Sequence, residues 1–252
     1  MAETQRVYGL HAVRALLRQE GVQVVHAWAQ DSRHDPKLET LIGELQARGS
    51  RVDRTPRREL DRLAPGVRHQ GILVEFQGGI AATDQDLDSF LATLTAPALL
   101  LVLDGVTDPH NLGACLRSAD AAGVQAVILP KDRSVGLTPV VRKVACGAAE
   151  SLPVFSVTNL ARTLRTLQDA GIWIYGAAGE AEQTLYDVDL KGSVALVLGA
   201  EGGGLRRLTR EHCDGLVKIP MAGTVESLNV SVATAVLLFE VVRQRWVGQG
   251  RS

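Results

Sequence analysis

Apolar positions in the first third of the chain follow helical and strand periods in turn. Two stretches repeat apolar residues every three to four positions, which predicts helices over residues 9–19 and 35–49, the second ending at Gly49. Two shorter β-prone runs predict strands over 22–30 and 70–76. The pattern indicates a small α/β unit.

A nearly continuous apolar run over residues 97–106 opens the second part of the chain, and such a run is typical of a parallel strand covered on both faces. Helical and strand periods then alternate. Helices are expected over 111–123, 140–151 and 159–171, and strands over 124–130, 153–157, 172–178 and 194–201. This order predicts an open α/β sheet with right-handed crossovers, whose ligands bind in loops beyond the carboxyl ends of the strands.

The chain closes with a strand, a polar loop and an apolar helix. The strand, over 217–221, is expected to stop at Pro220 and Met221, and the helix to begin at about Asn229. Its apolar residues repeat on one face, so we expect this helix to be buried. Ser227 and Asn229 stand at the helix start, where short polar side chains either cap free N–H groups or accompany a bound anionic or carbonyl ligand.

A stretch rich in glycine, small residues and acidic charge separates the two parts of the chain. It runs into a short apolar period that predicts a connecting helix over 87–94. We therefore expect an N-terminal domain over 1–78, a linker and helix over 79–96, and a C-terminal domain over 97–252. A chain of 252 residues is long enough for two such domains.

The composition is that of an ordinary globular protein, with 46% apolar and 22% charged residues. No apolar run is long enough to span a bilayer, and the N-terminus lacks the pattern of a signal peptide, so we expect a soluble chain without a membrane partner.

Cys115, Cys146 and Cys213 are odd in number and far apart, which favours a reducing cytoplasm over a disulfide framework. His212 beside Cys213 lacks two further ligands nearby, and we predict no metal site.

Positive charge is concentrated in one stretch, although the net charge of the chain is −1. Residues 48–69 carry seven arginines against three acidic residues. The arginines are Arg48, Arg51, Arg54, Arg57, Arg58, Arg62 and Arg68. Arginine suits bidentate phosphate contacts and stacking on bases, so the stretch indicates a nucleic-acid partner, with a solvated charged surface as the alternative.

Three unusual loops follow predicted strands, over residues 104–118, 199–208 and 220–229. The glycines of the second loop permit positive φ and close approach of a ligand to the backbone. Their spacing is not GxGxxG, and no GxxxxGK[ST] sequence occurs, which disfavours a nicotinamide site and an ordinary nucleoside triphosphatase.

Together the loops resemble the three motifs of the SpoU (TrmH) family of RNA ribose 2′-O-methyltransferases, within the SPOUT superfamily. The resemblance covers essentially the whole chain. The motif residues are Asn111, Gly113 and Arg117, then Gly199, Glu201 and Gly202, then Pro220, Ser227, Leu228 and Asn229. The N-terminal sequences VYGLHAVRALL and RHQGILVEF resemble the RNA-binding extension of the bacterial subgroup that methylates a guanosine in the peptidyl-transferase region of 23S rRNA.

The resemblance implies S-adenosylmethionine as methyl donor, held by backbone groups near Gly199, Ile219 and Leu228. It also implies an α/β methyltransferase domain with a C-terminal trefoil knot, a smaller L30e-like RNA-binding domain, and a homodimer with the active site at the subunit interface. The implied partner is 23S rRNA or a large-subunit precursor, and not DNA. On this basis the last loop is polar because it presents cofactor and substrate contacts at a capped helix start.

Arg117 matches the family's catalytic arginine, which is sometimes assigned as the base. A guanidinium is effectively always protonated in proteins, so we predict that Arg117 binds the phosphate of the target nucleotide and stabilises developing alkoxide charge. His110 is an alternative base because of the usual pKa of histidine, although the family motif does not require it.

The remaining candidate residues are polar groups with more than one role open to them. Asn111 either caps the helix that contains it or orients the ribose hydroxyl. Glu201 caps the helix over 204–212, pairs with Arg117 or assists proton removal, and we rank pairing and positioning first. Ser227 and Asn229 are expected to organise cofactor and substrate, since no Ser/His/Asp constellation accompanies them.

The sequence is also compatible with two rival interpretations. One is a noncatalytic RNA-binding protein, in which the arginine-rich stretch supplies affinity and the glycine loops only connect strands. The other keeps the enzyme but changes its substrate to tRNA or an antibiotic-binding site in rRNA.

Overall fold

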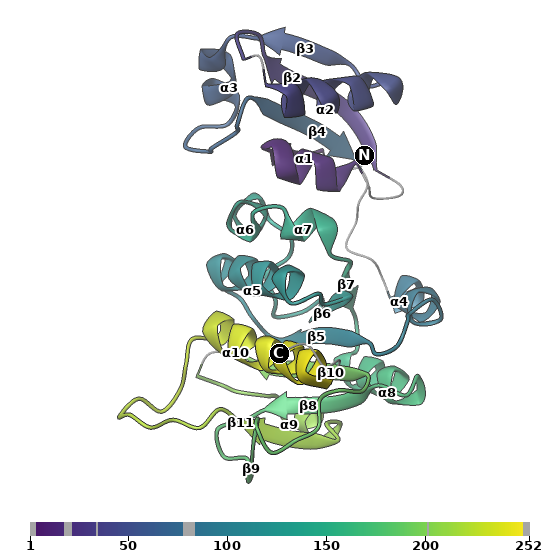
Figure 1. The fold of residues 1–252 in the computed structure, drawn as a ribbon, viewed down its shortest axis with the longest axis vertical. Helices are drawn as coiled ribbons and strands as arrows, with labels where there is room; N and C mark the ends of the chain where they lie inside the picture. Colours follow the sequence, from purple (N-terminus) through teal and green to yellow (C-terminus); the bar gives the residue numbers. More distant parts are fainter. Residues whose placement is uncertain (1–3, 18–21, 34, 78–83, 201, 249–252) are drawn as a thin grey trace. The chain divides into compact units, whose positions relative to one another are not determined.

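The computed structural model describes all residues except 1–3, 18–21, 34, 78–83, 201 and 249–252. The chain forms two compact units (Figure 1). The first comprises Met1–Ile80 together with Leu137–Ser151, and the second comprises Ala81–Gly136 together with Leu152–Ser252. The first unit thus includes a segment from the middle of the chain. The domain boundaries given above stay a prediction.

The first unit contains a four-stranded sheet in the order β1-β4-β2-β3. Its strands are β1 (Gln5–Tyr8), β2 (Gln23–Gln30), β3 (Val52–Thr55) and β4 (Ile72–Gln77), and its N-terminal helices are α1 (Leu10–Leu16), α2 (Pro36–Ala47) and α3 (Arg57–Leu63). Strand β4 pairs antiparallel with β1 and β2, whereas β2 and β3 are parallel. The sequence pattern missed β1, β3 and α3, because elements of four to seven residues are too short to show a clear period.

Each face of this sheet has its own apolar cluster. On one face, leucines of α1 and α2 pack against alternate strand residues such as Ala27, Val74 and Phe76. On the other, Leu60 of α3 packs with Leu73 of β4. The period of two along β4 thereby serves both clusters, which explains why nearly the whole strand is buried.

The segment 137–151 forms two short helices where the sequence predicted a single one over 140–151. Helix α6 (Pro139–Ala145) ends at Cys146, whose φ of 55° is left-handed, and α7 (Ala148–Ser151) follows Gly147 at φ 101°. A Cβ atom on Gly147 would lie 3.6 Å from the backbone nitrogen of Ala12. The prediction of one helix is therefore wrong, because the chain turns sharply where α7 packs against α1.

Buried Arg142 fixes this segment within the first unit through its contacts with Gln5 and Phe76. Arg142 Nη1 donates to Glu150 Oε1 at 2.8 Å, and Arg142 Nη2 donates to Gln5 Oε1 at 2.8 Å. The guanidinium also lies over the ring of Phe76, 5.5 Å from its centroid. Burial raises the pKa of the Glu150 carboxyl in spite of the neighbouring arginine.

The second unit is built on a seven-stranded sheet in the order β7-β6-β5-β10-β8-β11-β9, and all its pairs are parallel. Its strands are β5 (Leu99–Asp104), β6 (Ala126–Pro130), β7 (Val154–Val157), β8 (Trp173–Ala177), β9 (Gln183–Thr184), β10 (Val194–Gly199) and β11 (Gly215–Lys218). Its helices are α4 (Asp84–Leu91), α5 (Pro109–Ala121), α8 (Leu160–Asp169), α9 (Arg207–Glu211) and α10 (Val230–Gly248). The predicted open parallel sheet is confirmed.

Strand burial follows the sequence pattern closely. Strands β5 and β6 are buried along their whole length, and β10 is buried up to its last residue, as the continuous apolar runs predict. Helices α4 and α8 pack on one side of the sheet, while α5 and α10 lie together on the other (Figure 1). Strand β11 ends at Lys218 and not at Pro220 and Met221, because its partner β9 pairs with it only as far as Lys218.

Helix α10 is buried on one face and exposed on the other. The prediction that this helix is buried is therefore right for the first face and wrong for the second. Leu237, Leu238 and Val241 are fully or almost fully buried. Phe239 is 48% exposed and Trp246 is 60% exposed. Among the described residues, no helix is long and apolar enough to cross a membrane. The implied trefoil knot stays a prediction.

Candidate active site

The three motif loops begin at the carboxyl ends of β5, β10 and β11, as the sequence predicts. Strands β5 and β10 are neighbours, with Asp104 paired opposite Gly199. The first and second loops therefore start side by side. The first and third loops are joined by a hydrogen bond of 3.0 Å from Asn229 Nδ2 to Asn111 Oδ1.

The first loop turns from β5 into α5. Gly105 adopts a left-handed φ of 92°, and the Asp108 side chain caps α5 by accepting a 2.7 Å hydrogen bond from the backbone nitrogen of His110. The suggestion that Asn111 is the cap is therefore wrong, because Asp108 occupies that position and Asn111 lies in the first turn. Arg117 is exposed on the same helix.

The second loop folds back on the end of β10. Gly204 N donates to Ala200 O at 3.0 Å, and a Cβ atom on Gly199 would overlap the backbone of Gly204 and Leu205. Gly202 has a left-handed φ of 74°. Glu201 lies outside the described residues, so its pairing with Arg117 stays a prediction.

A buried carboxylate anchors the second loop to the first. The Asp104 side chain has no exposed surface and accepts hydrogen bonds from Arg206 N at 3.2 Å and Arg206 Nε at 2.5 Å. The Arg206 Nη2 atom makes a further ion-pair contact with it. Sequence analysis missed this pair, although an aspartate at the end of a fully apolar strand was a visible indication. The pair fixes the Arg206 end of the glycine loop, while the pairing of Gly199 with Asp104 in the sheet fixes the other end.

Asn229, the last residue of the third loop, lies directly before the start of α10. Its Oδ1 accepts from Ser231 N at 2.9 Å and from Ser231 Oγ at 2.6 Å, which is a helix cap. Its amide nitrogen reaches Asn111 in the same arrangement. The capping interpretation of Asn229 is therefore confirmed, and the other end of the same amide joins the third loop to the first. Its role toward cofactor and substrate stays a prediction.

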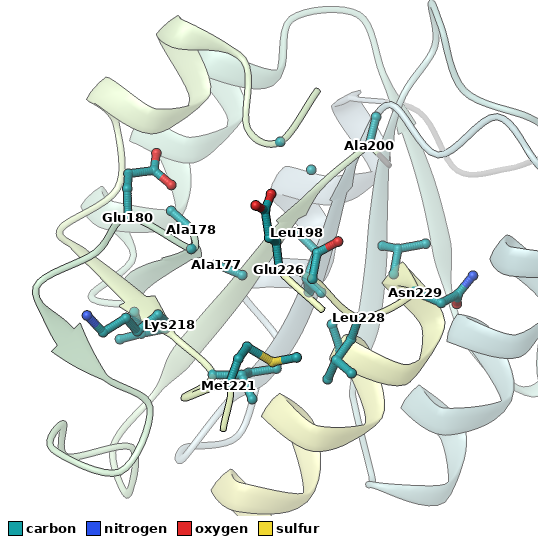
Figure 2. Close-up of a pocket in the computed structure, with 18 of the residues that line it drawn as sticks. Ala177, Ala178, Glu180, Leu198, Ala200, Lys218, Met221, Glu226, Leu228 and Asn229 are labelled. Carbon is teal, nitrogen blue, oxygen red and sulfur yellow. The ribbon is translucent and has the colours of Figure 1, made fainter. Parts of the chain in front are cut away.

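A cavity of about 700 Å³ opens between the second and third loops and the end of β8 (Figure 2). It is lined by the predicted cofactor positions Gly199, Ile219 and Leu228, and by Ser227 and Asn229. Its remaining lining residues are Ala177, Ala178, Gly179, Glu180, Leu198, Ala200, Gly202, Gly204, Val217, Lys218, Met221, Glu226, Val230 and Ala233. This volume is in the usual range for a site that binds a small molecule or cofactor.

The cavity wall is apolar with charged groups on part of its edge. Small or apolar side chains such as Leu198, Met221 and Leu228 face it, while Glu180 and Lys218 lie on the side opposite Asn229 (Figure 2). Glu180 pairs with Arg210. The pKa of its carboxyl is lowered, first by a hydrogen bond with the backbone and then by the hydrogen bond from Arg210. Such a mixture suits a ligand with a planar apolar part and charged ends.

Sequence reasoning missed the loop that begins with Ala178, Gly179 and Glu180. It follows β8 at the same edge of the sheet, so its position after a predicted strand could have revealed it. His110 is exposed and does not line the cavity, and neither does Arg117. No three His, Cys, Asp or Glu side chains gather as metal ligands in the part of the chain that the structure describes.

Comparisons with known proteins match both parts of the chain. Residues 98–239 match the model of the SpoU rRNA Methylase family, and residues 6–78 match a model described as RNA 2′-O ribose methyltransferase substrate binding. The 23S rRNA (guanosine-2′-O-)-methyltransferase RlmB of Pseudomonas aeruginosa is 58% identical over 97% of this chain and 98% of its own length. The protein of the same name from Pseudomonas putida is 56% identical over 98% of this chain and 99% of its own.

Solved structures agree over nearly the full length. The SpoU methyltransferase AviRb from Streptomyces viridochromogenes, in complex with the cofactor AdoMet, has a TM-score of 0.80 at 25% identity, covering 97% of this chain and 92% of that one. A crystal structure described as an RNA 2′-O ribose methyltransferase has a TM-score of 0.75 at 28% identity, covering 96% and 89% of the two chains.

Two glycines of the second loop give a matched test of the site. Gly199→Ala should reduce catalytic turnover by about 100-fold, because its Cβ atom would displace the loop by about an ångström or more. Gly203→Ala should have little effect, since nothing lies within 4 Å of a Cβ atom at that position. Steady-state kinetics and ligand titration would measure the difference, and equal activity of the two variants would contradict the proposed geometry.

Proposed function

We propose that this chain, which belongs to the SpoU rRNA Methylase family, transfers the methyl group of S-adenosylmethionine to the ribose 2′-oxygen of a guanosine in 23S rRNA. The observation that carries the proposal is the cavity at the meeting point of the motif loops, in a chain similar over its whole length to enzymes named for this reaction. The family and the enzyme class predicted from the three loops are confirmed. The proposal includes a cytoplasmic location, which an rRNA substrate supports, and RNA and not DNA as the partner.

The residues around the cavity fit S-adenosylmethionine, the cofactor of this family. Backbone groups of Gly199, Ile219 and Leu228 are available to hold the adenine edge, and Leu198 and Met221 provide apolar walls. Bound there, the cofactor supplies a methyl group on a positively charged sulfur. The closed turn over Gly199 keeps the backbone of this residue in a fixed position before any ligand arrives, which reduces the cost of ordering it.

The substrate side of the site consists of α5 and the start of α10. The hydrogen bond between Asn229 and Asn111 holds the two helix starts together beside the cavity. The exposed guanidinium of Arg117 carries a permanent positive charge, so it binds an RNA phosphate and does not remove the proton. Catalysis in this scheme comes largely from positioning the ribose oxygen in line with the methyl group.

Transfer of labelled methyl tests the proposal directly. Purified protein, labelled S-adenosylmethionine and 23S rRNA that lacks its own 2′-O-methylguanosine should give incorporation at one ribose 2′-oxygen. Fully modified 23S rRNA and tRNA should stay unlabelled. Label on tRNA alone would reject the rRNA substrate, and RNA binding without labelling of any RNA would favour a noncatalytic RNA-binding protein.

Arg117→Ala should abolish methyl transfer and leave cofactor affinity within about twofold, because Arg117 does not line the cavity. Isothermal titration with S-adenosylmethionine and a single-turnover transfer assay would separate the two effects. Arg162→Ala, which removes an exposed arginine from α8, is the control and should transfer normally. A parallel loss of cofactor affinity in Arg117→Ala would reject the phosphate role.

The proposal includes a homodimer formed through α10. Val232, Phe239 and Trp246 are exposed and seven residues apart, so they share one side of the helix. An exposed apolar stripe of this kind is typical of an interface. Since Val230 and Ala233 of the same helix line the cavity, a partner on α10 would lie close to the site.

Phe239→Asp should convert the dimer to a monomer and lower methyl transfer with it, because a buried carboxylate at an apolar interface is unfavourable. Analytical ultracentrifugation would measure the change in mass. Leu208→Asp offers a control of the same kind, as Leu208 is 50% exposed on α9 and away from the stripe. A wild-type chain that sediments as a monomer would exclude the dimer.

A further inference from the structure

Most arginines of residues 48–62, the first part of the arginine-rich stretch, are paired with carboxylates. Four of these six arginines form ion pairs with Asp or Glu side chains at the surface. The pairs are Arg51–Asp53 at 3.1 Å, Arg54–Glu39 at 2.5 Å, Arg57–Asp61 at 3.8 Å and Arg62–Glu59 at 2.6 Å. Paired charges of opposite sign project little net field, so this stretch attracts a polyanion less than its arginine count indicates.

A second set of basic residues in the same unit comes from three segments of the chain that contain no acidic residue. Residues 5–17, 64–72 and 137–147 contain no aspartate and no glutamate. The exposed side chains that they present include His11, Arg68 and Lys143. Within the described residues, neither Arg68 nor Lys143 has a carboxylate partner in an ion pair.

Specific contacts bring these three segments together. Lys143 Nζ donates to Gly66 O at 2.9 Å, which places α6 against the loop between α3 and β4. The start of α1 joins the same loop, because the Leu10 backbone nitrogen donates to Gln70 Oε1 at 3.1 Å. The carbonyl oxygen of Arg68 lies 3.8 Å from the Cβ position of Gly9. The three segments that carry His11, Arg68 and Lys143 therefore lie against one another.

The loop that carries Arg68 is held in a defined shape. Gln70 adopts a left-handed φ of 50°, which is uncommon for a residue with a side chain. The buried His69 ring supports this turn, since its Nδ1 accepts from Gly71 N at 3.1 Å and its Nε2 lies 3.0 Å from Asp61 Oδ1. The sequences VYGLHAVRALL and RHQGILVEF thus meet at this point, which gives both a structural role in shaping the surface.

We propose that His11, Arg68 and Lys143 form a binding surface for the phosphodiester backbone of the RNA substrate, an inference that rests on the proposed function. Lysine and arginine side chains free of carboxylates release counterions when they contact phosphates, which is the main source of affinity for RNA. Lys143 lies in the part of the chain that matches the methylase family model and not the substrate-binding model. The RNA surface therefore draws on both stretches of sequence.

The test measures binding of an unmodified 23S rRNA fragment by fluorescence anisotropy over a range of KCl concentrations. Arg68→Gln and Lys143→Gln should each weaken binding by about threefold to tenfold at physiological salt, and each should reduce the slope of log K against log[KCl] by about 0.7 to 1. Lys143→Arg keeps the charge and should restore both. Arg62→Gln, from an ion pair of the arginine-rich stretch, is the matched comparison and should change affinity by less than twofold.

The controls separate this inference from the proposed function. Titration with S-adenosylmethionine should be unchanged in every variant, and thermal unfolding should show that each one is folded. Unchanged RNA affinity and salt slope in Arg68→Gln and Lys143→Gln, with wild-type protein that methylates rRNA, would overturn the surface and leave the function standing. A larger loss in Arg62→Gln would assign binding to the arginines of residues 48–62, and wild-type protein that neither binds nor methylates rRNA would reject both proposals.

Discussion

The parallel pairing of β5 with β10 is the constraint on which the site depends. Six residues of each strand pair in register, and the last pair sets Asp104 beside Gly199. Both strands are covered on both faces, so a shift of register would move apolar side chains out of fitted positions in the core. The starts of the first two motif loops are thereby fixed by the core of the protein and not by the loops themselves.

Close backbone packing then converts this fixed edge into a cavity. The chain folds back over Gly199, and the buried Asp104 holds Arg206 at the far end of the turn. The third loop joins through Asn229, whose amide both caps α10 and reaches Asn111. The same few polar groups therefore stabilise the helix starts and shape the site at the ends of the parallel strands.

Charge in the first unit shows why counting residues is not enough to locate a nucleic-acid surface. The arginines of residues 48–62 are abundant, yet four of them lie against carboxylates. Segment 137–151 packs into this unit through Arg142, which donates to Gln5, and in doing so places Lys143 beside the loop that carries Arg68. Electrostatic potential depends on which charges remain unbalanced in space.

The sequence by itself determined the parallel sheet, because β5, β6 and β10 are continuous apolar runs, and the three loops identified the family. Positions such as Gly199 and Leu228 followed from the motifs, and the cavity does include them. Only the tertiary structure revealed the Asp104–Arg206 anchor, the lining loop that begins at Ala178 and the turn at Cys146. The physical reason is that periodicity reports contacts between near neighbours in sequence, whereas the anchor joins residues 102 positions apart and the turn is set by packing against α1.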